Sequence, residues 1–100
     1  MTIKQIKQQL SDMENIQALT GKKSFTVYDF YGFGKCVVCV INDPYLSRFV
    51  VACVQVSTGK DLFNGNHSRP CDNMSDSIDV TNEILSDMVN AGEIKMTEVY

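Results

Sequence analysis

The fold of this chain is decided by the stretch Lys35-Cys-Val-Val-Cys-Val-Ile41 and by Arg48-Phe-Val-Val-Ala-Cys-Val-Gln-Val-Ser57, which follows it after six residues. Both stretches are rich in β-branched residues, which favour strands. Successive side chains of a strand point to opposite faces, so Val37 and Val38 would lie on different sides of a sheet. Both sides are apolar here, whereas a strand with one solvated face alternates apolar and polar residues. The sequence therefore predicts two strands that are buried on both faces.

A sheet that is apolar on both faces needs a cover on each side. Two helices on opposite sides would supply both covers, or a second copy of the chain would cover one face. An apolar sheet face left bare would in any case be an association site. The sequence leaves both arrangements open, and a homodimer through the sheet is one of its predictions.

Two helices are expected, one before and one after the strands. Thr2 and Gln5 have the spacing of a capping box, and apolar residues then recur every three or four positions. A first helix is therefore predicted to run from this box to Gly21. Asp76 or the residue after it can cap a second helix, and Gly92 would end it.

Further strands are expected on either side of these elements. Residues 25–31 are rich in β-branched and aromatic side chains, and Gly32-Phe33-Gly34 predicts a tight reversal into the next strand. Residues 94–100 have strand propensity and would add an edge to the sheet. Residues 61–75 are predicted to be a loose loop, in which Leu62-Phe63 could form a short edge strand. The predicted fold is α+β in the order α-β-β-β-α-β: an N-terminal helix, a three-stranded antiparallel meander, a second helix and a C-terminal edge strand.

Length and composition indicate one globular domain, residues 1–100. Apolar residues make up 44% of the chain and charged residues 21%, which excludes a disordered tail. No targeting segment is visible, nor any run near the ~20 apolar residues of a membrane-spanning helix, so a cytoplasmic location is expected. The four cysteines fit a reducing compartment, where a buried free cysteine acts as a small hydrophobe.

Charge is distributed unevenly along the chain. Residues 1–60 hold seven basic and four acidic side chains, whereas residues 72–100 hold seven acidic side chains and one basic one. On the second helix, at ~100° per residue, carboxylates form a stripe on the face opposite the apolar one. The candidate partner-binding residues are Asp72, Asp76, Asp79, Glu83 and Asp87.

Two interpretations of this acidic stripe are open. Any surface helix needs a polar face, and Asp76 and Asp79, near the first turn, complement the helix dipole. Glu83 and Asp87, however, are like charges four residues apart, which local stability does not favour. The second interpretation is that the stripe binds the basic, nucleic-acid-binding surface of a partner protein, with carboxylates in place of phosphates. The predicted function is therefore a non-enzymatic protein-binding module that can act as an inhibitor.

The alternative function is single-stranded nucleic-acid binding through the first hairpin. Aromatic side chains on a sheet can stack on bases, and basic side chains beside them can bind phosphates. The residues concerned are Lys22, Lys23, Tyr28, Tyr31 and Lys35. A sequence pI of about 4.9 argues against direct nucleic-acid binding, because an acidic protein repels phosphates.

No metal site, cofactor or catalytic motif is expected. Cys36 and Cys39 have the spacing of a redox or zinc pair, but on a strand their side chains point to opposite faces, so core packing is expected. His67 and Cys71 are four residues apart in the loose loop, and structural zinc usually needs two such pairs. His67 is the single histidine, and no pattern ties it to a nucleophile and an acid, so no enzyme activity is predicted.

Overall fold

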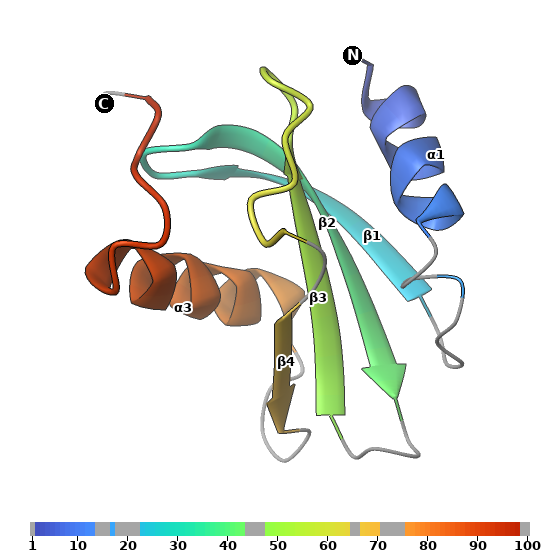
Figure 1. Cartoon of the computed structure of the whole chain (residues 1–100). Coiled ribbons are helices and arrows are strands. Elements are labelled where there is room, and N and C mark those ends of the chain that lie inside the picture. Colours follow the sequence, from blue (N-terminus) through green and yellow to red (C-terminus); the bar gives the residue numbers. More distant parts are fainter. Residues whose placement is uncertain are drawn as a thin grey trace.

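The computed structural model describes residues 2–13, 17, 23–43, 48–64, 67–70 and 76–98. Its helices and strands follow in the order α1 (Ile3–Asp12), β1 (Lys23–Phe30), β2 (Gly34–Asp43), β3 (Arg48–Gln55), β4 (His67–Pro70) and α3 (Ser77–Asn90). The four strands form one antiparallel sheet in the order β1-β2-β3-β4 (Figure 1). The predicted α+β fold, with an N-terminal helix, an antiparallel sheet and a second helix, is confirmed.

The two central strands are buried on both faces, as the sequence predicts. One set of their side chains packs against α3 and the other against α1, so the sheet is the middle of three layers. The α3-facing core consists of Phe30, Phe33, Cys36, Val38, Val40, Val51, Cys53, Leu62, Phe63, Val80, Ile84, Leu85 and Met88. The α1-facing core consists of Ile6, Leu10, Val37, Cys39, Ile41, Val50, Ala52 and Val54.

Two helices on opposite faces therefore supply the covers that the apolar strands require. Cys36 lies in the α3-facing core and Cys39 in the α1-facing core, which confirms that their thiols point to opposite faces. Both faces of β2 and β3 are packed in this way, so neither central strand leaves a bare face for a second copy. The homodimer through the sheet is not tested by this packing and stays a prediction.

Helix α1 begins at the predicted capping box. Thr2 Oγ1 accepts a hydrogen bond from Gln5 N at 3.1 Å, and Gln5 Oε1 accepts one from Thr2 N at 2.8 Å. The helix ends at Asp12, earlier than predicted. Gly21, the predicted end, lies outside the described residues.

Helix α3 begins and ends where the sequence predicts. Asp76 is its N-cap and accepts hydrogen bonds from Ile78 N and Asp79 N. Gly92 follows the C-cap residue with φ +74°, a conformation that favours glycine at helix ends. Of the helices that the structure describes, none has the length and apolar character needed to cross a membrane.

The turn between β1 and β2 depends on glycine. Phe33 N donates to Phe30 O at 3.0 Å, which closes the turn. Gly32 has φ +82° at the third position of this turn, a conformation that L side chains rarely adopt. The predicted reversal is therefore confirmed.

Residues 93–98, called the tail below, lie against this turn. Thr97 N and Glu98 N both donate to Gly32 O at 2.9 Å. A Cβ atom added to Gly32 would lie 2.7 Å from Met96 Cγ, so glycine is also what lets the tail approach the backbone.

The fourth strand lies in a different place from the one predicted. β4 pairs with the first half of β3 and is formed by residues of the predicted loose loop. Its sequence, His-Ser-Arg-Pro, has no apolar alternation that would have indicated a strand. Residues 94–98 form no strand, because the tail bonds to the β1–β2 turn instead of to a sheet edge. Leu62 and Phe63, a predicted edge strand, form a turn and bury their side chains in the α3-facing core.

Candidate functional site

The outer surface of α3 consists of two rows of exposed side chains that run along the helix. Side chains four residues apart lie on one line of a helix surface. The carboxylate row consists of Asp79, Glu83 and Asp87. The neutral row beside it consists of Asn82, Ser86 and Asn90. Because α3 contains no lysine or arginine, nothing on the helix itself offsets the negative charge of this surface.

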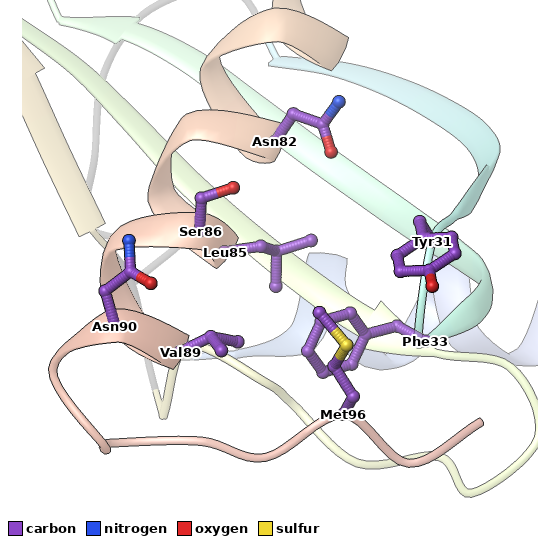
Figure 2. A pocket seen from close by; sticks show the side chains of 8 residues that line it. All are labelled: Tyr31, Phe33, Asn82, Leu85, Ser86, Val89, Asn90 and Met96. Carbon is purple, nitrogen blue, oxygen red and sulfur yellow. The ribbon is translucent and has the colours of Figure 1, made fainter. Parts of the chain in front are cut away.

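A pocket of about 230 Å³ adjoins the neutral row, between α3, the β1–β2 turn and the tail. Besides the neutral row, Leu85 and Val89 line it from α3, and Tyr31, Phe33 and Met96 line it from the turn and the tail. Figure 2 shows these side chains facing one another across the pocket. Tyr31 is 68% exposed and Met96 is 50% exposed, so this turn pocket offers two large apolar side chains that a partner can cover.

The buried side chain of Gln55 holds the walls of the turn pocket together. Gln55 Nε2 donates to Phe33 O and to Thr97 Oγ1, both at 2.6 Å, and Gln55 Oε1 accepts from Thr58 Oγ1 at 2.9 Å. Gln55 is 1% exposed, so these bonds replace the water that its amide loses on folding. Strand β3, the β1–β2 turn and the tail therefore meet at one side chain, next to the position of Met96.

On the other side of α3, the carboxylate row ends in an ion pair with β4. Arg69 Nη2 and Asp87 Oδ2 are 2.5 Å apart. His67, also on β4, packs edge-on against Phe63 with ring centroids 5.3 Å apart. These β4 side chains, α3 and Glu93 of the tail line a further, open pocket of about 200 Å³. Since Arg69 offsets the charge of Asp87, the negative charge of the row is concentrated at its other two members.

The structure brings three of the five predicted partner-binding residues together as the carboxylate row. Asp79 and Glu83 are exposed, and Asp87 forms the ion pair with Arg69. Asp76 has a structural task, because its Oδ1 accepts from Ile78 N at 2.8 Å as the N-cap of α3. Asp72 lies outside the described residues.

The residues of the alternative nucleic-acid surface do not share a face. The strand register places Lys23 and Lys35 on the α1 side of the sheet and Tyr28 on the α3 side. Tyr31 lines the turn pocket, and Lys22 lies outside the described residues. The sheet therefore separates the basic side chains from the aromatic ones, whereas base stacking with phosphate binding needs them together.

The buried thiols are suited to core packing and not to nucleophilic attack or metal binding. Burial raises the pKa of Cys39 to about 11, although the nearby charge of Lys23 acts in the opposite direction. A hydrogen bond with Cys36, together with burial, raises the pKa of Cys53 well above its usual value. A thiol with a raised pKa is a poor nucleophile and metal ligand at neutral pH. Within the described ranges, no three metal-binding side chains come close enough to hold an ion, and Cys71 lies outside those ranges.

Sequence reasoning missed the turn pocket. The neutral row did leave a signal, since Asn82, Ser86 and Asn90 recur every four residues on a predicted helix. The sequence predicts Tyr31 to be a base-stacking residue, because Tyr31 belongs to a run of aromatic residues flanked by lysines. Met96 left no signal, because it stands in a segment predicted to be a strand.

No protein-family model, curated protein or solved structure matches this chain. The chemistry of the α3 surface therefore carries the functional argument, since an α+β fold alone is compatible with many functions.

Proposed function

We propose that this protein is a non-enzymatic binding module that docks a basic partner protein on the outer surface of α3. The observation that carries the proposal is an exposed carboxylate row that runs beside an apolar pocket on the same helix. Lysine and arginine side chains of the partner would pair with the row, and an apolar side chain would enter the turn pocket.

Each part of this surface supports a separate aspect of binding. Asp79 and Glu83 attract a basic partner at long range, which speeds association and makes it sensitive to salt. The neutral row offers amide and hydroxyl groups that can donate to and accept from a partner backbone. Tyr31 and Met96 supply the apolar contact that dominates affinity in most interfaces.

The nucleic-acid groove of another protein is the partner surface that fits this chemistry most closely. Such a groove is lined by basic side chains spaced to bind successive phosphates. A row of carboxylates can occupy the same positive potential and exclude the nucleic acid. In that case the protein acts as an inhibitor of the partner.

Charge reversal with a matched control tests the proposal. Glu83→Lys inverts the charge in the middle of the carboxylate row, whereas Asp12→Lys makes the same change on α1, on the other face of the sheet. The probe is a fluorescent amphipathic peptide rich in lysine, and fluorescence anisotropy measures its Kd. We expect the native chain and Asp12→Lys to bind it alike, and Glu83→Lys to raise the Kd about tenfold. Equal Kd values for all three chains would reject the acidic surface.

Two further measurements separate the apolar contact from the charges and test the alternative. Tyr31→Ala should raise the Kd of the peptide without changing its dependence on salt, because the change removes no charge. A labelled single-stranded oligonucleotide that binds the native chain, but not Tyr28→Ala or Lys23→Ala, would favour nucleic-acid binding instead.

A further inference from the structure

Among the strands that the structure describes, β1 stands at an edge of the sheet, and its outer side is a long and regular template for another strand. β1 is the first strand in the sheet order, and its register with β2 continues through all eight residues without a bulge. Val27 is 36% exposed and points to the α1 side, and Tyr28 is 47% exposed and points to the α3 side. Neither helix therefore covers the middle of this edge, and β1 contains no proline that would obstruct pairing.

The backbone groups on this edge belong to the odd-numbered residues of β1. Val56 N donates to Lys35 O at 2.9 Å, so the odd-numbered residues of β2 bond to β3. Bonding direction alternates along a strand, so the even-numbered residues of β2 bond to β1, where their partners are also even-numbered. The residues with outward-pointing amides and carbonyls are Lys23, Phe25, Val27 and Asp29.

We propose that two copies of this chain pair antiparallel through β1, in the register that sets Thr26 opposite the partner's Thr26. Two residues that face each other across an antiparallel pair either both bond to the other strand or both bond away from it. The residues of β1 that can bond outward are odd-numbered, so an odd-numbered residue must face an odd-numbered residue of the second copy. In this register Lys23 faces the partner's Asp29, and Phe25 faces the partner's Val27. The two-fold axis repeats both pairs.

The side chains of β1 make a second copy the fitting partner, because they complement themselves. Lys23 and Asp29 carry opposite charges at the two ends of β1. An aromatic side chain opposite a β-branched one, as Phe25 is opposite Val27, is a favourable cross-strand pair. A shift of two residues in either direction sets Phe25 or Val27 against itself and separates Lys23 from Asp29. Asp29 already interacts within its own chain, and a carboxylate has capacity for a further hydrogen bond. The pairing joins the two sheets into one and is independent of the function proposed for α3.

Sedimentation velocity of the full chain over a series of concentrations tests the pairing. We expect a monomer–dimer equilibrium for the native chain. Lys23→Asp and Asp29→Lys each set like charges against one another twice per dimer, so each should raise the dimer Kd about tenfold or more. An equimolar mixture of these two variants should regain the native affinity, because each interface then again has opposite charges at both ends.

Val27→Pro provides a test of the backbone bonds. The Val27 amide points outward, so proline removes no bond to β2 but blocks pairing at the edge. The variant should keep the circular dichroism spectrum of the native chain and sediment as a monomer. A native chain that stays monomeric up to about 1 mM would overturn the proposal. A dimer that all three variants leave unchanged would overturn it as well.

Discussion

The two faces of the sheet are covered by helices that are held to different degrees. α1 has ten residues and buries Ile6 and Leu10, whereas α3 has fourteen residues and buries five. A fully buried aliphatic side chain contributes about 1.5–3 kcal/mol, so the docking of α1 is worth a few kcal/mol before the entropy of ordering it is subtracted. The firmly held helix also carries the candidate binding surface. α1 is therefore the lighter cover and the one expected to open locally, whereas α3 must stay in place for the candidate site to exist.

The cysteines allow the two faces to be followed separately. Cys39 lies beneath α1, and Cys36 and Cys53 lie beneath α3. A buried thiol reacts with an alkylating reagent only after its cover opens, so the site of labelling reports which face has opened.

The largest effect is expected from truncation beneath α3. Ile84→Ala should lower the free energy of unfolding by about 2–5 kcal/mol, because it leaves a cavity in the α3-facing core. Leu10→Ala should lower the free energy of unfolding by less, because the loss cannot exceed the free energy that the docking of α1 contributes. Urea denaturation measures both, and Leu10→Ala should in addition speed the labelling of Cys39 without speeding that of Cys53. Equal losses of stability would contradict the comparison.

A smaller effect is expected from pH on the α1 face. The native chain keeps the proton of Cys39 up to a pKa of about 11, whereas the exposed thiol of the unfolded chain has a pKa near 9.0. Between these values the native state binds more protons, so stability falls as pH rises. The loss of stability is therefore spread over the range from about pH 9 to about pH 11, and its size follows the difference between the two pKa values.

Cys39→Ala is the control for this pH dependence. When urea denaturation is repeated across this range of pH, the free energy of unfolding of Cys39→Ala should fall less than that of the native chain. A native chain and a variant that lose stability in parallel would show that Cys39 stays in contact with water.

The smallest effect is expected from the two helix caps. Thr2→Ala and Asp76→Ala each remove the side chain that caps a helix, at a cost of about 0.5–2 kcal/mol. Both variants should lower the urea midpoint slightly, but only Thr2→Ala should speed the labelling of Cys39. Mass spectrometry locates the labelled thiol. Faster labelling of Cys53 in Thr2→Ala would contradict the independence of the two faces.

The fold could be predicted from the sequence wherever local chemistry decides the backbone. The cap at Asp76 and the glycine at Gly92 locate α3, and valines on both faces of β2 and β3 predict a sheet covered twice. β4 could not be predicted, because four polar residues become a strand only by bonding to the edge of β3. The tail could not be predicted either, because its strand propensity is overridden by bonds from Thr97 N and Glu98 N to Gly32 O.

The candidate site likewise has one part that the sequence predicts and one part that it does not. The carboxylate row follows from the helical period alone, so the sequence located it. The turn pocket depends on three segments that meet only after folding, and Tyr31 and Met96 are far apart in the sequence. The pair of Arg69 with Asp87, which offsets one charge of the row, likewise joins residues 18 positions apart.

The attachment of the tail has a consequence for the range of partners. The tail is tied down by backbone bonds to Gly32 and by the bond from Gln55 to Thr97. Each such bond contributes about 0.5–1.5 kcal/mol net, whereas global unfolding of a domain costs about 5–15 kcal/mol. Releasing residues 95–98 would therefore cost less than unfolding the domain, and it would carry Met96, a flexible thioether, away from Gly32. A pocket whose wall can be released in this way would adapt its width to the incoming side chain, which would favour breadth of recognition over selectivity for a single sequence.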